Sequence, residues 1–186
     1  VIIINTIVLF AMKNRRERKP SYIEVGVGPT CLKDCAFCLE GGRGSKREVV
    51  NLSDFKKILK RNRPEKVVLS GGEPLLNKEL LSYIDLAKEF NVSTISLVSS
   101  WESGFGAKFI KKLLDSGVNE VMLSIEGPSE IHDILTRRDG SYKNIAEAFR
   151  YFYAYKRKYD FRLIIHSNIN KINVSILPIF VSRFLK

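Results

Sequence analysis

The chain has 186 residues, a length that suits one domain with a sizeable core. Hydrophobic residues make up 45% and charged residues 27%, which is typical of a globular fold. The net charge is +11, but Lys and Arg are interleaved with Glu and Asp, which favours a solvated surface over a nucleic-acid interface. All three cysteines lie close together, which argues against a secreted disulfide framework and for metal ligands in a reducing, cytoplasmic compartment.

The opening segment, residues 1–19, is apolar from Val1 to Met12 and basic from Lys13 to Lys19. The apolar run is roughly a third short of the ~18–20 residues that a membrane span needs. Its positive charge follows the apolar run, whereas a signal peptide has the charge first. We therefore expect a strand or helix of a further N-terminal part and no stable membrane span, with a membrane-surface anchor as the alternative. Residues 20–186 are expected to form the core domain.

From Pro20 onward, short β-branched runs alternate with segments of helical periodicity. The runs are nearly continuous in apolar residues, as strands covered on both faces should be. The predicted strands are Tyr22–Val27, Glu65–Ser70, Val92–Ser99, Glu120–Ile125 and Phe161–His166.

The intervening segments carry signals of helix starts and ends. Ser53 is a candidate N-cap of the first helix and Asn77 of the second. Gly117 stands where the third helix should end. A fourth apolar stripe runs from Ile145 to Phe152, and Ser175–Lys186 predicts a fifth helix, in which Pro178 must lie in the first turn.

This alternation predicts an α/β fold with a parallel sheet and right-handed crossovers. About five strand–helix units are too few for a closed eight-stranded barrel, so we expect an open, partial parallel β/α barrel. Ligand sites in such folds lie at the C-terminal ends of the strands. The residues with distinctive chemistry should therefore follow strands, and in this sequence they do.

The cysteine motif, Cys31-Leu-Lys-Asp-Cys35-Ala-Phe-Cys38, follows the first predicted strand. Thiolates suit zinc or iron–sulfur clusters. Structural zinc takes four ligands, usually from two separated cysteine pairs, whereas this loop has three and no second cluster follows. Three thiolates on a cubane would leave one iron open to another ligand. The pattern leaves open an iron–sulfur cluster, zinc with a distant His, and inert cysteines.

A second motif, Ser70-Gly71-Gly72-Glu73-Pro74, directly follows the second predicted strand. With the cysteine motif, in which Phe37 takes the aromatic place, it makes the chain resemble the radical S-adenosylmethionine (SAM) superfamily from Ser21 to about Leu185. The resemblance implies that the glycine-rich segment binds the amino group of SAM. An ammonium needs acceptors, which Glu73 and the carbonyls of Gly71 and Gly72 can supply. In isolation, the same residues would be an ordinary turn.

A third segment begins at Ser124-Ile-Glu126-Gly-Pro and resembles the branch that modifies peptides and sulfatases, and relatives in cofactor biosynthesis. The resemblance places Ser124 and Glu126 near the SAM ribose, and one of Arg137 and Arg138 on its carboxylate, with a surface role as the alternative for both arginines. Asn168, at the end of the fifth strand with His166, is a candidate for cofactor or substrate contacts or a hydrogen-bonded loop residue. His132 is expected to order its loop.

After the third strand, Ser99-Ser100-Trp101 departs from the usual Thr-Asn-Gly of the family. The missing glycine puts the SAM or substrate contacts of this loop in question. The sixth strand–helix unit of the family is also missing, so the core domain is expected to be incomplete at its C-terminus.

The resemblance implies an oxygen-sensitive oxidoreductase or transferase with a [4Fe–4S] cluster and SAM as cofactors. The cluster would cleave SAM reductively to methionine and a 5′-deoxyadenosyl radical, which abstracts hydrogen from a small molecule, peptide, cofactor precursor or RNA. A ferredoxin or flavodoxin would supply the electron. Two alternatives stay open: a zinc or iron–sulfur binding module without catalysis, and a basic nucleic-acid-binding protein.

Overall fold

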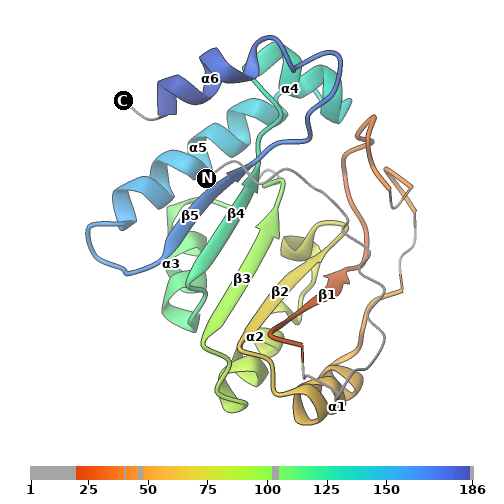
Figure 1. Cartoon of the computed structure of the whole chain (residues 1–186), viewed down its shortest axis with the longest axis vertical. Helices are drawn as coiled ribbons and strands as arrows, with labels where there is room; N and C mark the ends of the chain where they lie inside the picture. The colour runs from red at the N-terminus through yellow and green to blue at the C-terminus, as the bar shows by residue number, and fades with distance from the viewer. Residues whose placement is uncertain (1–19, 40, 46–47, 102–104, 185–186) are drawn as a thin grey trace, which may run out of the picture.

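The computed structural model describes residues 20–39, 41–45, 48–101 and 105–184, so the predictions for residues 1–19 lie outside the described part. Its centre is one open sheet of five parallel strands in the order β1-β2-β3-β4-β5 (Figure 1). The strands are β1 (Tyr22–Gly28), β2 (Lys66–Gly71), β3 (Thr94–Ser99), β4 (Glu120–Ser124) and β5 (Arg162–His166). All five predicted strands are confirmed within two residues, and so is the open, partial barrel.

Helices connect successive strands and pack against the sheet (Figure 1). They are α1 (Leu52–Asn62), the 3-10 helix η1 (Pro74–Leu76), α2 (Leu80–Glu89), α3 (Ala107–Ser116), α4 (Ser129–Thr136), α5 (Ser141–Tyr155) and α6 (Leu177–Phe184). The periodicity does not predict α4, because this helix has only about two turns and follows Gly127-Pro128. His132, expected to order a loop, lies within it.

Two of the predicted helix starts are wrong. The cap of α1 is Asn51, whose side-chain oxygen accepts from the Asp54 backbone N–H at 2.9 Å, so Ser53 already lies inside the helix. Asn77 accepts from the Glu79 N–H at 2.8 Å and thereby orders the turn before α2, but Glu79 holds the N-cap position. The end of α3 at left-handed Gly117 and the place of Pro178 in the first turn of α6 are confirmed.

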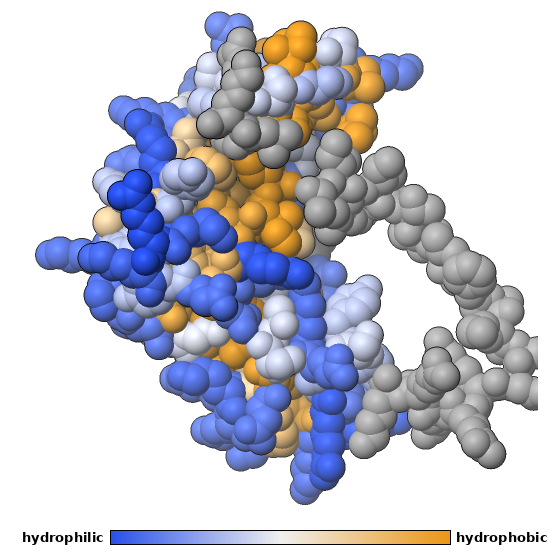
Figure 2. All heavy atoms as spheres, turned by 60° about the vertical axis from the view of Figure 1, so that its left-hand side comes forward, coloured by the Kyte–Doolittle hydropathy of each residue, from blue (hydrophilic) through white to orange (hydrophobic). Residues whose placement is uncertain are grey.

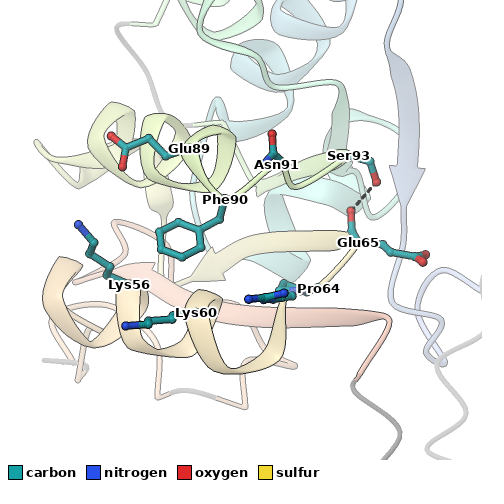
Figure 3. A pocket seen from close by; sticks show the side chains of 9 residues that line it. Lys56, Lys60, Pro64, Glu65, Glu89, Phe90, Asn91 and Ser93 are labelled. Carbon is teal, nitrogen blue, oxygen red and sulfur yellow. Dashed lines mark hydrogen bonds between the residues drawn. The ribbon is translucent and has the colours of Figure 1, made fainter.

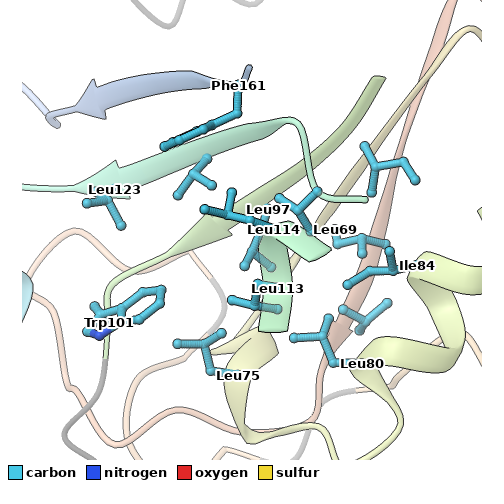
Figure 4. Close-up of a cluster of buried hydrophobic side chains, with 14 of the residues drawn as sticks. Leu69, Leu75, Leu80, Ile84, Leu97, Trp101, Leu113, Leu114, Leu123 and Phe161 are labelled. Carbon is cyan, nitrogen blue, oxygen red and sulfur yellow. The ribbon is translucent and has the colours of Figure 1, made fainter. Parts of the chain in front are cut away.

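The hydrophobic core lies between the sheet and the helices α1, α2, α3 and α5. One residue from each of β2, β3 and β4 illustrates this: Leu69, Leu97 and Leu123 are fully buried. They belong to the same cluster as the helix residues Ile84 and Leu113 (Figure 4). Each fully buried side chain of this size stabilises the fold by about 1.5–3 kcal/mol. The packed core therefore fixes the strands, and with them the positions of the loops at their ends.

An ion network closes the N-terminal end of the sheet. Glu120, the first residue of β4, is fully buried and accepts hydrogen bonds from Lys66 of β2 and Arg162 of β5. Burial alone would raise the pKa of Glu120, but the hydrogen bonds from these two cations outweigh it and lower the pKa. The carboxylate at this end therefore has its compensating charges within the protein.

The surface has both charged and apolar regions. Figure 2 shows apolar side chains gathered on the upper and central part of one face, with hydrophilic residues around them. Exposed apolar residues of the segment from β5 to α6 are Ile169, Ile172, Val174 and Ile179. Within the described ranges, no helix combines the length and hydropathy that a bilayer crossing requires.

Candidate functional site

The loops that follow the strands gather at the C-terminal end of the sheet. Figure 1 shows all five arrows pointing toward the end where α4 and the segment from β5 to α6 lie. The loop after β1, residues 29–39, carries the cysteines, and we refer to it as the cysteine loop. The structure joins this loop to the segments after β2, β3 and β4 by the contacts described below.

The three cysteines are present as thiols, each partly buried in the cysteine loop. A tight turn joins the last two, with the Cys38 N–H donating to the Cys35 carbonyl at 3.0 Å, and half-buried Phe37 lies in this turn. Within the described residues, no three His, Cys, Asp or Glu side chains converge closely enough to hold a single metal ion. A cubane cluster presents a different iron to each thiolate, so its ligands do not have to converge on one point.

Burial changes the chemistry of Cys35 most clearly. It raises the pKa of the Cys35 thiol to about 12, and the nearby charge of Lys33 only partly opposes this shift. The thiol is therefore protonated at neutral pH until a metal displaces the proton.

The segment after β4 holds the cysteine loop from one side. The Asp34 and Ala36 N–H groups donate to the carbonyls of Thr136 and Leu135, at 3.2 and 2.9 Å. The two arginines that follow α4 also reach this loop. Arg137 lies 3.4 Å from the Asp34 carboxylate, and Arg138 donates to the Leu32 carbonyl at 3.2 Å.

The glycine-rich motif packs against the end of β1. A Cβ on Gly28 would lie 2.7 Å from the Glu73 backbone nitrogen, so only glycine permits this approach. Gly71 has a φ of 106°, which also favours glycine, and the Glu73 N–H donates to the Thr30 carbonyl at 2.8 Å. Pro74 then begins η1. The motif thus lies directly beside the start of the cysteine loop.

Glu73 points inward and is fully buried. One carboxylate oxygen accepts from Ser99 Oγ at 2.8 Å and from the Leu75 N–H at 3.2 Å. The other accepts from the backbone N–H and the hydroxyl of Ser100, at 2.9 and 2.8 Å. Burial raises the pKa of Glu73, and these hydrogen bonds oppose the rise. The side chain thus anchors the loop after β3, which the motif alone does not reveal.

In the loop after β3, Trp101 stands where the family usually has glycine, yet its backbone has a conformation that favours glycine. Trp101 has a φ of 54°, in the left-handed region. Its indole is buried against Phe152 at a centroid distance of 5.2 Å, and its Nε1–H donates to the Phe105 carbonyl at 2.9 Å. Aromatic packing therefore holds a backbone conformation that glycine would adopt without strain.

Lys33 is a site residue that the sequence does not single out. It stands between Cys31 and Cys35, yet only 1% of its surface is exposed. Its ammonium donates to the Ser100 carbonyl at 2.5 Å and lowers the pKa values of Glu73 and Glu126, against the rise that burial causes. A lysine is normally exposed, so the sequence carries no signal for this burial.

The ends of β4 and β5 form a second buried group. Glu126 accepts from the Asn168 N–H at 2.7 Å and faces its side-chain amide at 3.4 Å. Asn173, also absent from the predicted set, donates to the carbonyls of Glu126 and Asn168 at 2.9 and 2.8 Å. Burial raises the pKa of Glu126 to about 7. Ser124 is half-buried and pairs in register with His166.

The two histidines differ in their surroundings. His132 is fully buried; its Nδ1 accepts from the Glu126 N–H at 3.1 Å, and its Nε2 lies 2.9 Å from Ser141 Oγ. Burial lowers the pKa of His132 to about 4, so its ring is neutral and supports the backbone after β4. His166 is half-buried on the strand next to Ser124, and burial lowers its pKa as well.

A separate hollow of about 720 Å³ lies at the other end of the sheet, between the ends of α1 and α2 (Figure 3). Lys56, Lys60 and Arg63 line one side of it, and Glu89 and Phe90 the other. Two helices end here, and their carbonyls favour cations such as these side chains. The basic residues therefore complement helix ends, and the candidate site remains the group around the cysteine loop.

Comparison with sequence families finds a match to the description "Radical SAM superfamily" over residues 25–174. Among similar curated proteins, "Probable GTP 3',8-cyclase" of Methanococcus maripaludis (strain C5) is 28% identical over 119 residues, which are 62% of this chain and 39% of that protein. "GTP 3',8-cyclase" of Aliarcobacter butzleri is 29% identical over 115 residues, 59% of this chain and 35% of that protein. The chain thus matches less than half the length of these relatives.

Solved structures share the fold at low identity. "Native anSMEcpe with bound AdoMet and Kp18Cys peptide" has a TM-score of 0.69 at 17% identity, covering 89% of this chain and 48% of that one. Streptococcus suis SuiB bound to its precursor peptide SuiA has a TM-score of 0.63 at 16% identity, covering 87% and 36%. At this identity the likeness concerns the fold alone, and it agrees with the partial barrel.

Proposed function

Because the chain belongs to the radical SAM superfamily, a family of enzymes that use a [4Fe–4S] cluster and SAM, we propose that it is the core of such an enzyme and binds both cofactors at the C-terminal end of its sheet. One observation carries the proposal: a loop with three cysteine thiols is fixed beside a glycine-rich strand end and two buried carboxylates. When bound there, and given one electron by an external donor, the two cofactors would supply hydrogen-atom abstraction from a substrate through a 5′-deoxyadenosyl radical, with methionine as the other product.

Cys31, Cys35 and Cys38 are the proposed cluster ligands. They are three soft donors on one loop, one fewer than structural zinc takes, which favours a cubane over the zinc alternative. The hydrogen bonds from Asp34 and Ala36 to α4 hold this loop in place. Half-buried Phe37 would shield the cluster from water on one side.

The segment after β2 would receive the amino group of SAM. Carbonyls of Gly71 and Gly72 are the proposed direct acceptors, since Glu73 is buried and occupied by Ser99 and Ser100. Glu73 would act by holding the loops after β2 and β3 together and by adding negative charge near a cationic ligand. This division of roles refines the expectation that Glu73 contacts the ammonium itself.

The remaining contacts would come from the segments after β4 and β5. Ser124, Glu126 and Asn168 lie together and can exchange hydrogen bonds with ribose hydroxyls. Arg137 and Arg138 both reach the cysteine loop, so either can meet a carboxylate bound beside the cluster. Arg137 is exposed and Arg138 half-buried, so Arg137 has more freedom to reorient when a ligand enters.

The substrate is proposed as a small molecule, a peptide, a cofactor precursor or an RNA. Relatives named GTP 3',8-cyclase make GTP a suitable first probe. Structural neighbours crystallised with peptides make a cysteine-containing peptide the second. An acidic electron-transfer protein such as a ferredoxin or flavodoxin would suit the basic chain as electron donor.

Anaerobic reconstitution with iron and sulfide tests the proposal. We expect about four irons per chain, as one cubane holds, and release of methionine and 5′-deoxyadenosine after SAM and dithionite are added. One bound zinc and no iron would indicate a zinc module. A cluster without 5′-deoxyadenosine would indicate a binding module, and steeply salt-dependent RNA binding without a cluster would indicate a nucleic-acid-binding protein.

A further inference from the structure

Lys33 has an unusual position for a lysine. It is the middle residue between two proposed cluster ligands and is nearly inaccessible to solvent, with 1% of its surface exposed. Burying an ammonium is energetically costly unless other groups compensate its charge. We therefore expect negatively charged or hydrogen-bond-accepting groups around Lys33 that stabilise its buried ammonium.

The surroundings of Lys33 are rich in negative groups. Its ammonium donates to the Ser100 carbonyl at 2.5 Å and acts on the buried carboxyls of Glu73 and Glu126. Ser100 itself is held by Glu73, at 2.9 Å from its N–H and 2.8 Å from its hydroxyl. Lys33 thus ties the cysteine loop to the end of β3 and compensates the two carboxylates beside it.

The same charge bears on the cluster of the proposed function, on which this inference rests. The thiolate-bound cluster gains one negative charge when an electron from dithionite or a donor protein reduces it. The net charge and solvent exposure around a cluster set its reduction potential. A buried cation is screened little by solvent, so its effect on a neighbouring charge is large.

We propose that Lys33 is a positioning and tuning residue, which locks the cysteine loop to β3 and favours the reduced form of the bound cluster. Arg43 provides a matched comparison. It also donates to the cysteine loop, to the Leu32 carbonyl at 3.2 Å, but it is exposed. Water and salt screen the charge of Arg43, so its removal should leave the cluster almost unchanged.

The test is a reduction-potential titration of the reconstituted protein, followed by electron paramagnetic resonance. Lys33→Met should keep the side-chain volume and make reduction at least about tenfold less favourable, which is a fall of about 59 mV for one electron. Lys33→Arg should recover most of the potential, and Arg43→Met should match the wild type. A merely structural role for Lys33 would alter iron content without moving the potential.

Equal potentials in Lys33→Met and the wild type would overturn the inference and leave the proposed function intact. A wild-type protein that takes up no cluster would instead refute the proposed function. If the Lys33→Met variant does not retain iron, the double variant Lys33→Met/Glu126→Gln is measured instead, because it removes one positive and one negative charge together. Recovery of iron by the double variant supports charge compensation, and no recovery contradicts it.

Discussion

The two ends of the sheet each bury carboxylates but compensate them differently. At the N-terminal end, Glu120 has two cationic partners, Lys66 and Arg162, and its pKa is lowered. At the C-terminal end, Glu73 and Glu126 have raised pKa values, and the buried cation acting on both is Lys33. The carboxylate at the N-terminal end is fully compensated by cations of the protein. The two carboxylates at the C-terminal end are compensated only in part, so this end favours the binding of further positive charge.

This difference indicates which end is built to bind a ligand. Buried charges are costly unless paired, so a fold retains incompletely paired ones mainly where a ligand or cofactor completes the site. SAM carries an ammonium and a sulfonium, which suit the carboxylate-rich end. The cysteine loop lies at this same end, so the charge pattern and the proposed thiol ligands point to one place.

The largest effect should come from the cysteines. Replacing Cys31, Cys35 or Cys38 by Ala should reduce the bound iron from about four atoms per chain to almost none, because the chain has three cysteines in all and each variant removes one of the proposed ligands. Iron and sulfide analysis of the reconstituted variants measures this. Circular dichroism should show that the sheet persists, and a variant that keeps its full iron would exclude that cysteine as a ligand.

Glu73→Ala should weaken SAM binding by roughly 1.5–3 kcal/mol, the scale of hydrogen bonds to a charged group. The reason is indirect, since the carboxylate orders Ser99 and Ser100 and adds charge to the site. Equilibrium dialysis of the reconstituted protein with labelled SAM gives the affinity. Unchanged affinity, with normal iron content, would show that the motif after β2 is only a turn.

Two glutamine substitutions compare the ends directly. Glu120→Gln should lower the free energy of unfolding by about 1–3 kcal/mol at neutral pH, because it removes the anion that pairs two cations. Glu126→Gln should not lower it at that pH, because the wild type has by then lost most of the stabilising contribution of the protonated Glu126 carboxyl, which Gln resembles. Denaturant titrations of the metal-free proteins supply both values. A greater loss in Glu126→Gln than in Glu120→Gln would reverse the comparison.

The pH dependence of Glu126 has a definite sign. Its folded pKa of about 7 lies above the usual 4.5, so its stabilising contribution is complete below pH 4.5 and is lost as the pH rises through about 7. Glu126→Gln should therefore gain stability relative to the wild type as the pH rises from about 4.5 to about 7, and above pH 7 it should remain the more stable protein by about 1–3 kcal/mol. A constant difference between the two proteins from pH 5 to 8.5 would contradict the raised pKa.

The smallest effect is a local titration. The chain has two histidines, so their ring proton signals can be resolved by nuclear magnetic resonance. His132 should titrate near pH 4, because the folded state favours its neutral ring, and this stabilising contribution is complete above pH 6.5 and lost as the pH falls through about 4. His132→Asn identifies its signal. A midpoint at 6.5 would show that His132 is accessible to water.

Sequence periodicity predicts the fold well and its details less well. Continuous apolar runs specify buried parallel strands, and all five were found. The sequence pattern places the first helix cap wrongly because Asn51 and Ser53 are both good caps, and only the folded chain shows that Asn51 reaches the Asp54 N–H. The periodicity does not reveal α4, because eight residues contain little periodic signal.

The sequence predicts those parts of the candidate site that belong to motifs with fixed spacing. The cysteines and the glycine-rich segment are contiguous in sequence, so they could be recognised. The link from Glu73 to Ser99 and Ser100, and the burial of Lys33, depend on which loops meet across the sheet. The loop at Trp101 illustrates the same limit, since aromatic packing holds there a backbone conformation usually left to glycine.

The central claim is that the C-terminal end of the sheet binds a cluster with an open iron and SAM beside it. Electron paramagnetic resonance spectroscopy tests this claim most directly. The dithionite-reduced, reconstituted protein is measured before and after addition of SAM, with Glu73→Ala treated in parallel. We predict that SAM shifts the signal of the wild type and that the variant needs more SAM for the same shift. A full cluster whose spectrum ignores SAM, at concentrations that shift other members of the family, would contradict the account.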